Sequence, residues 1–282
     1  MSASWTFFYG VWRTGNVPLI GSTTQAVWLA SIVFDGARAF DGLAPDLDLH
    51  AARAIDSARK MGLEPTEQVD EIVSLMREGI RKFPPSTALY VRPMFFGEGG
   101  FIIPEPDSAR FALVVHELPM PDASGFSACL STFRRPSPET AVTDAKASAL
   151  YPNVARALAE ARARGFDNAV KLDLNGNVAE FATSNLLMVK DGVVYTPAPN
   201  GTFLNGITKQ RVVGLLKEDG VDVVETRIVW ADLMEADEVF STGNYGKVVP
   251  CVRLEDREVG RGPIGDRARE LYFEFAKAHP VG

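Results

Sequence analysis

The sequence predicts an α+β fold of two domains: a small α/β lobe at the N-terminus and a larger lobe with a curved or barrel-like sheet and surrounding helices. The chain has 282 residues, 46% of them hydrophobic, so it is long enough to bury a sizeable core and divide into two lobes. Strand-like and helical segments are mixed up to residue 118, and strand-like runs cluster after residue 126. We expect a small domain over residues 1–118, a linker over 119–125 and a larger domain over 126–282.

The N-terminal lobe begins with two aromatic-rich stretches, SWTFFYGVW and SIVFDGARAF, which predict strands broken by glycine-containing turns. A helix is expected from Leu49 to about Met61, because apolar residues recur at helical spacing and Gly62 stands where a C-cap would. A second helix, roughly Thr66 to Lys82, ends before FPPS. The stretches ALYVRPMFF and ARFALVVHEL indicate further strands of the same sheet.

The C-terminal lobe follows PMPDASG, where two prolines and a glycine interrupt both periodicities. GFSACLSTF is strand-like, and VARALAEARARG predicts an alanine-rich helix that ends at Gly165. Three strand-like runs separated by NGN and KDG turns predict a β-meander over NAVKLDLNGNVAEFATSNLLMVKDGVVYTP. NGITKQRVVGLLKEDG predicts an amphipathic helix that opens just after Gly206, and VDVVETRI predicts a strand.

Composition excludes several classes of function. A net charge of -7, with no run of Lys and Arg interleaved with aromatics, makes nucleic acid an unsuitable partner. The three histidines are scattered and the two cysteines lie outside any CxxC spacing, so we expect no metal site and no disulfide scaffold. No charged and then apolar leader opens the chain, and no apolar run is long enough to cross a bilayer. We therefore expect a cytoplasmic protein without a membrane partner.

Lys146 lies among small residues in the stretch DAKASA. A lysine that forms a Schiff base needs an unprotonated amine some of the time, and small neighbours allow a flat cofactor to lie against the backbone. A solvated surface lysine is the alternative interpretation of this residue taken alone. The assignment of Lys146 as a catalytic residue therefore depends on its companions.

Two companions strengthen that assignment. Glu180 places an acid in an otherwise apolar strand, and a buried carboxylate requires a partner such as an arginine or a cationic ring nitrogen. The stretch NGITKQ places a glycine, a hydroxyl residue and free N–H groups at a helix start, which favours anion binding. Thr208 could equally serve only as a helix cap.

These segments, in the order DAKASALY, GNVAEFATSNLLMVKDGVVYTP, NGIT and DEVFSTGN, resemble the class IV aminotransferases, and most closely those of the branched-chain amino acid type. The resemblance covers nearly the whole chain, from VFDGARAF to GPI near the C-terminus. Its most specific part is the conjunction of the lysine, the E-x-x-x-x-N run and the GIT helix. It implies a fold type IV enzyme whose larger domain binds pyridoxal 5'-phosphate.

The resemblance also implies roles for individual residues. Lys146 would form the Schiff base and shuttle the proton, Tyr151 would hydrogen-bond the cofactor's phenolic oxygen, and Glu180 would pair with its pyridine nitrogen. The groups implied to bind the phosphate are the side chain of Arg53 and the N–H groups of Ile207 and Thr208. The other implied cofactor positions are Leu204, Gly206, Gly243 and Asn244. The implied substrate positions are Phe34, Gly36, Tyr90, Arg92, Tyr245 and Gly246.

Three positions depart from the family pattern. Residues 243–246 read GNYG where the family usually has a glycine followed by Thr-Ala-Ala, and Tyr245 changes the volume and polarity of the pocket. A tyrosine commonly found before the VFEG-type strand is replaced by Trp28 or Leu29, and the acid of that strand is Asp35. These changes preserve the implied cofactor chemistry and bear on the substrate.

The function implied by the resemblance is ping-pong transamination between an amino acid, a branched-chain L-amino acid first of all, and a 2-oxo acid such as 2-oxoglutarate. The alternatives of the same fold are a D-amino-acid transaminase, an (R)-amine transaminase and an aminodeoxychorismate lyase. An alternative of another class is a non-catalytic carrier of pyridoxal phosphate or a metabolite-binding protein. The resemblance further implies a homodimer.

Overall fold

The computed structural model describes residues 3–282, which form two compact units. The first unit contains residues up to Met120, together with Asp144–Leu150 and Ala276–Gly282. The second unit contains Pro121–Thr143 and Tyr151–Phe275. The short segment that carries Lys146 therefore packs with the N-terminal residues, although it follows the expected linker in sequence. The domain limits expected from the sequence stay a prediction.

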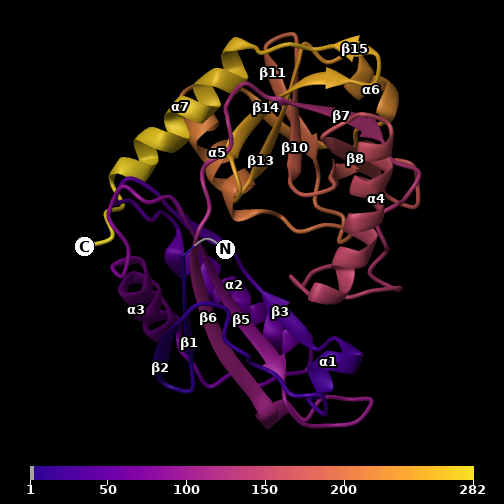
Figure 1. The fold of residues 1–282 in the computed structure, drawn as a ribbon. Helices are drawn as coiled ribbons and strands as arrows, with labels where there is room; N and C mark the ends of the chain where they lie inside the picture. Colours follow the sequence, from indigo (N-terminus) through magenta and orange to yellow (C-terminus); the bar gives the residue numbers. More distant parts are fainter. Residues whose placement is uncertain (1–2) are drawn as a thin grey trace. The chain divides into compact units, whose positions relative to one another are not determined.

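The first unit is built on an antiparallel sheet whose strands follow the order β2-β1-β6-β5-β3, with β4 also paired to β5 (Figure 1). Its strands are β1 (Ser4–Phe8), β2 (Val11–Thr14), β3 (Ile32–Phe34), β4 (Ala37–Ala39), β5 (Leu89–Gly97) and β6 (Ala109–Glu117). Alternate residues of β5 are buried, as expected for a sheet with one face on the core. All the strands predicted for this lobe are present.

Two helices, α2 (Leu47–Lys60) and α3 (Val69–Ile80), supply the apolar faces that pack on this sheet. The chain leaves α2 through Gly62, whose φ of 79° lies in the left-handed region, and α3 begins with a reciprocal capping box between Gln68 and Glu71. The shorter helical segments of this unit are α1 (Gln25–Leu29), η1 (Pro106–Ser108) and η2 (Ser148–Leu150). Both long helices predicted from the sequence are confirmed.

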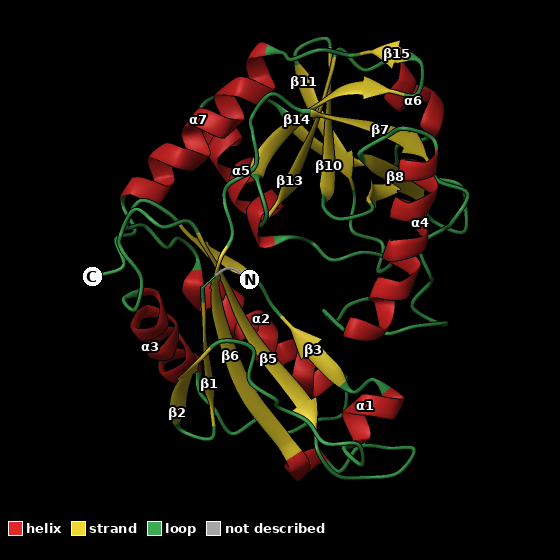
Figure 2. Cartoon of the chain, in the orientation of Figure 1, coloured by secondary structure: helices red, strands yellow, loops and turns green. Residues whose placement is uncertain are grey.

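The second unit contains a nine-stranded sheet in the order β12-β11-β10-β13-β14-β7-β8-β9, with β15 paired to β14. The sheet is strongly curved (Figure 2). Strand β9, at one end of the strand order, lies close to β10 and β11. The pairs β11–β12, β14–β7 and β7–β8 are parallel, and the others are antiparallel. Its strands are β7 (Phe126–Leu130), β8 (Asn168–Leu172), β9 (Val178–Phe181), β10 (Asn185–Lys190), β11 (Val193–Pro197), β12 (Val223–Thr226), β13 (Glu238–Gly243), β14 (Lys247–Leu254) and β15 (Arg257–Glu258).

Helices surround this curved sheet, as the sequence predicted. They are α4 (Tyr151–Ala163), α5 (Ile207–Glu218), α6 (Trp230–Met234) and α7 (Pro263–Lys277). Apolar side chains of α5 and α7 pack against strands β10, β11 and β13, and the alanine face of α4 packs against β7 and β8. Within residues 3–282, no helix combines the length and the apolar character needed to span a membrane.

The predicted β-meander is wrong in its connectivity. The segment contains four strands rather than three, because residues 182–184 break the run that was read as one strand. The hairpin β8–β9 pairs with β7, whereas the hairpin β10–β11 pairs with β13 and β12. Strand β10 is paired on one side with β11 and on the other with β13, so no edge of it remains for β9.

Candidate active site

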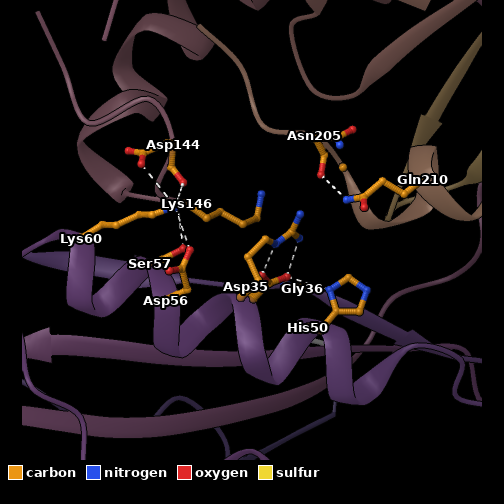
Figure 3. A network of polar contacts seen from close by, with 12 residues as sticks. Asp35, Gly36, His50, Asp56, Ser57, Lys60, Asp144, Lys146, Asn205 and Gln210 are labelled. Atoms are coloured by element: carbon orange, nitrogen blue, oxygen red, sulfur yellow. Dashed lines mark hydrogen bonds and ion pairs between the residues drawn. The ribbon is translucent and has the colours of Figure 1, made fainter. Parts of the chain in front are cut away.

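Lys146 is held in the first unit by its backbone. Its N–H donates to Ser57 Oγ at 3.1 Å, and its carbonyl accepts from the N–H of Phe34 at 3.2 Å (Figure 3). The flanking Ala145 and Ala147 are buried in the core, so the small neighbours serve packing. The Lys146 ammonium nitrogen lies 5.2 Å from the centre of the Phe34 ring. The backbone of Lys146 is therefore fixed by hydrogen bonds on both sides of its side chain.

A buried ionic cluster lies between β3 and α2 in the same unit. Asp35 Oδ2 accepts from Arg53 Nε at 2.6 Å, and its Oδ1 accepts from Arg53 Nη2 at 2.8 Å. His50 Nδ1 lies 2.8 Å from Asp35 Oδ1, and the N–H of Gly36 donates to the same oxygen at 2.6 Å (Figure 3). Asp35 is fully buried. The carboxylate therefore fixes the orientation of the Arg53 guanidinium, the group expected to bind an anion.

The charge state of Asp35 follows from these contacts. Burial alone would raise the pKa of its carboxyl, but Arg53 and then His50 outweigh burial and hold that pKa well below its usual range. A depressed pKa in the folded state contributes stability that is present above the unfolded value of about 3.9. That stability is lost as the pH falls through the folded value.

We expect Asp35→Asn to lower the free energy of unfolding at pH 7 by about 3 kcal/mol, because it leaves Arg53 without its buried counter-charge. As the pH drops below about 4, the stability of the variant should also fall less than that of the unmodified protein. Urea unfolding at pH 7 and at acid pH measures both effects. The control Asp219→Asn removes an ion pair with Arg267 near the surface and should change stability far less. Equal effects of the two substitutions would contradict the cluster's role.

The expected substrate residues Tyr90 and Arg92 lie two positions apart on β5, so their side chains share one face of the sheet. Arg38 and His116 are the cross-strand partners of Tyr90, and the rings of Tyr90 and His116 are 5.5 Å apart. Burial, and then the charges of Arg92 and Arg38, lower the pKa of His116. This face carries two guanidinium groups beside a histidine that favours its neutral form, which suits an anionic group such as a carboxylate.

In the second unit, Glu180 on β9 is held by two polar partners. Its Oε1 lies 3.4 Å from Arg135 Nη1, and its Oε2 accepts from Asn185 Nδ2 at 3.4 Å. Arg135 is itself anchored, because its Nε donates to the carbonyl of Thr202 at 2.8 Å. The side chains of Glu180 and Arg135 are only 12% and 6% exposed. These contacts hold the Glu180 carboxylate in one orientation.

Asn185 links this carboxylate to the start of helix α5. Its Nδ2 donates to the carbonyl of Leu204 at 3.0 Å, and its Oδ1 accepts from the N–H of Gly206 at 3.0 Å. A Cβ atom at Gly206 would collide with Asn185 Oδ1, so the position requires glycine. Gly206 is the N-cap of α5 and supplies no side-chain cap, which leaves the first N–H groups of the helix, including those of Ile207 and Thr208, for an anion.

The turn between β13 and β14 carries unsatisfied donors. Lys247 Nζ donates to Asn244 Oδ1 at 2.9 Å, whereas Asn244 Nδ2 is buried with no hydrogen-bond partner among the described residues. The Thr242 hydroxyl, near the end of β13, is likewise buried without a hydrogen-bond partner among residues 3–282. A Cβ atom at Gly243 would lie 2.8 Å from Ser184 Cβ, so this position also favours glycine. Buried donors of this kind require a partner, which a bound anion would supply.

The other expected site residues of the second unit differ in how exposed they are to solvent. Tyr151 is the first residue of α4 and is 39% exposed. Tyr245, in the turn after β13, is 54% exposed, and the adjoining Gly246 is buried. Both tyrosine rings are thus accessible to a ligand.

The expected site residues divide between the two units. The group in the first unit consists of Phe34, Gly36, Arg53, Tyr90, Arg92 and Lys146. The group in the second unit consists of Tyr151, Glu180, Leu204, Gly206, Ile207, Thr208, Gly243, Asn244, Tyr245 and Gly246.

Sequence reasoning missed three residues that organise these groups. His50 lies three positions before Arg53 on one face of α2, and this i, i+3 spacing was the available signal. Asn185 is the last residue of the E-x-x-x-x-N run, whose structural role the sequence did not reveal. Nothing in the sequence around Arg135 indicated a role, because its partner Glu180 lies 45 positions later in the chain.

These residues fit pyridoxal phosphate. A ring with a protonated nitrogen needs a fixed carboxylate, which Glu180 offers, and its phosphate needs donors, which the uncapped α5 terminus and Asn244 Nδ2 offer. The aldehyde needs an amine, which Lys146 offers in the first unit. Each requirement of the cofactor is matched by a group that the fold holds in place.

The family comparison agrees with this donor set. Residues 32–254 match the family described as amino-transferase class IV, which is more than half of the chain. The chain belongs to the class IV aminotransferases. Among the relatives of this aminotransferase, the branched-chain-amino-acid aminotransferase of Pseudomonas aeruginosa is 34% identical over 283 residues, covering 94% of this chain and 89% of that protein. The branched-chain-amino-acid aminotransferase of Escherichia coli is 30% identical over 277 residues, covering 93% and 88%.

A solved structure adds a closer likeness for this aminotransferase. An aminotransferase from Brucella abortus, bound to the cofactor PLP, superimposes with a TM-score of 0.96 at 52% identity, over 98% of this chain and 99% of that one. The fold type IV architecture and the family expected from the sequence are confirmed.

Proposed function

We propose that this aminotransferase uses pyridoxal 5'-phosphate to transfer an amino group from a branched-chain L-amino acid to a 2-oxo acid such as 2-oxoglutarate. The reaction proceeds in two half-reactions of ping-pong type. Relatives with branched-chain names that match over most of the chain support the choice of substrate.

One observation carries the cofactor assignment. Glu180, held by Arg135 and Asn185, belongs to the same hydrogen-bonded network as the uncapped start of α5, because Asn185 bonds both Glu180 and the N–H of Gly206. A carboxylate and an anion-binding helix terminus joined through one side chain suit a ligand with a cationic ring at one end and a phosphate at the other.

The residue roles of the proposal are those that the resemblance to the family implies. Glu180 accepts a hydrogen bond from the protonated ring nitrogen, and Tyr151 donates one to the phenolic oxygen. The phosphate ligands of the proposal are Arg53, the N–H groups of Ile207 and Thr208, and Asn244. The positions lining the ring and the substrate are Leu204, Gly206, Gly243, Phe34, Gly36, Tyr90, Arg92, Tyr245 and Gly246.

When bound, the cofactor withdraws electrons from the substrate's Cα through its protonated ring. Lys146, in its neutral form, would take the proton from Cα and deliver it to the carbon of the cofactor that carried the aldehyde. Glu180 would keep the ring nitrogen charged, and the Asp35 carboxylate fixes the Arg53 guanidinium, which would bind the phosphate. Arg92 on β5, with Arg38 on β4, would bind a carboxylate of the amino acid or the oxo acid.

We expect L-leucine to change the visible absorption spectrum of the cofactor-loaded protein in a single half-reaction without any oxo acid. D-alanine and an (R)-arylalkylamine, added in separate cuvettes, should leave the spectrum unchanged. Addition of 2-oxoglutarate after L-leucine should restore it. A change with D-alanine or the amine alone would contradict the choice of substrate and retain the aminotransferase.

A second candidate function, a D-amino-acid or (R)-amine transaminase, is favoured by one feature. The turn at residues 243–246 presents the exposed ring of Tyr245 where the family usually has alanine. A ring at this point changes the volume available to a substrate, and the cuvettes described above separate the two candidates.

The assembly and location belong to the same proposal. We place the enzyme in the cytoplasm as a homodimer. The exposed apolar side chains of Phe101, Ile102 and Ile103, each at least 67% exposed, support a covered surface in the first unit.

A further inference from the structure

Lys171 on β8 is a charged side chain that the proposed function leaves without a role. It is fully buried, and its Nζ donates to Asn153 Oδ1 on helix α4. Lysine is almost never fully buried unless it is paired. A neutral asparagine satisfies one hydrogen bond but leaves the charge uncompensated, so the counter-charge has to come from elsewhere in this unit.

The Glu180 carboxylate lies on the strand next to Lys171. Lys171 and Glu180 are cross-strand partners in the antiparallel pair β8–β9, so their side chains share one face with Cβ atoms about 5 Å apart. Arg135, 3.4 Å from Glu180, approaches the same carboxylate. Arg156 on α4, one turn after Asn153, adds a third positive charge that acts on Lys171.

The balance of these charges is positive. Burial, with Arg135 and Arg156, lowers the pKa of Lys171 to about 8, while Glu180 acts in the opposite direction. The side chain is therefore mostly protonated at pH 7. Two cations, Lys171 and Arg135, then act on the Glu180 carboxylate, and Arg156 adds its charge beside Lys171. A carboxylate compensated by more than one cation stabilises a bound cation less than an isolated carboxylate does.

We propose that Lys171 is a positioning residue that acts through Glu180: with Arg135 it keeps the carboxylate ionised and fixed, and it limits how strongly Glu180 holds the proton on the cofactor's ring nitrogen. This inference rests on the proposed function. It explains why a buried lysine stands directly opposite the carboxylate that faces the cofactor. The prediction is that loss of the Lys171 charge strengthens the affinity of the ring nitrogen for its proton.

The test uses the cofactor-loaded protein and the variant Lys171→Met, which keeps the length of the side chain and removes its charge. The pH at which the ring nitrogen gains its proton, followed by the nitrogen-15 NMR chemical shift of ring-labelled cofactor, should rise by about one unit at low salt. The control Lys209→Met removes another fully buried lysine of the same unit, paired with Glu225 at 2.6 Å, and should leave that pH unchanged.

A second measurement distinguishes an effect on the ring nitrogen from a general effect on folding. The Lys171→Met apoprotein should bind pyridoxal phosphate several-fold more tightly than the unmodified apoprotein. It should bind 1-deazapyridoxal phosphate, which has carbon at the ring-nitrogen position, with unchanged affinity. If Lys171→Met fails to fold, the variant Asn153→Asp serves instead, because its carboxylate compensates the Lys171 charge. It should also raise the pH at which the ring nitrogen gains its proton.

The outcomes distinguish the two proposals. An unmodified protein that takes up no pyridoxal phosphate overturns the proposed function and this inference together. Cofactor uptake with no shift in Lys171→Met or Asn153→Asp overturns this inference alone. Equal changes in affinity for the cofactor and its deaza analogue also overturn it, because a purely structural role would act on both.

Discussion

Replacing Lys146 by alanine should lower the rate of the half-reaction with L-leucine by roughly 10⁴-fold or more, because the base that moves the Cα proton is removed. The apoprotein should still bind pyridoxal phosphate non-covalently, since the groups assigned to the phosphate and the ring nitrogen lie on other residues. Borohydride reduction followed by peptide mass spectrometry should find the cofactor attached at Lys146 in the unmodified protein and nowhere in the variant.

The matched control is Lys60→Ala. Lys60 lies in the same unit and forms ion pairs with Asp56 at 2.8 Å and with Asp144 at 3.2 Å, two residues from Lys146 (Figure 3). Its loss removes a lysine from the neighbourhood without removing the proposed base, so the half-reaction rate should stay within a few-fold of normal. A cofactor adduct that persists in Lys146→Ala, or equal rate losses in the two variants, would disprove the assignment.

The elements that the sequence predicted well are those whose determinants are local. The helix α5 follows Gly206, and the helix α2 precedes Gly62, because glycine and helical periodicity act within a few residues. The conjunction of Lys146, the E-x-x-x-x-N run and the GIT helix was also visible, since each part is a short stretch. Family membership followed from that conjunction and is confirmed.

What the sequence could not predict depends on pairing between distant segments. Strand β10 pairs with β13, whose first residue follows that of β10 by 53 positions, so β10 is not hydrogen-bonded to β9. The partnership of Arg135 with Glu180 depends in turn on where the curved sheet places β9. The alanines beside Lys146 were interpreted as space for a cofactor, yet they fill the core of the first unit. Composition alone does not distinguish these two reasons for a small side chain.

Replacing Glu180 by glutamine should lower the half-reaction rate roughly 100-fold, because a charge-assisted hydrogen bond to the ring nitrogen becomes a neutral one. The same change should cost about 3 kcal/mol of stability, since the buried Arg135 loses its counter-charge. Stopped-flow spectroscopy with L-leucine measures the first effect and urea unfolding measures the second. Because the amide keeps the shape of the carboxylate, Asn185 and the start of α5 should keep their positions.

The variant Glu225→Gln tells these two effects apart. It removes the carboxylate that pairs with Lys209, a fully buried lysine of the same unit, and no role in the reaction is proposed for either residue. Its stability should fall while the half-reaction rate stays near normal. If Glu180→Gln kept a normal rate, the ring nitrogen would have another partner, and the balance of charge around Lys171, Arg135 and Glu180 would serve the sheet alone.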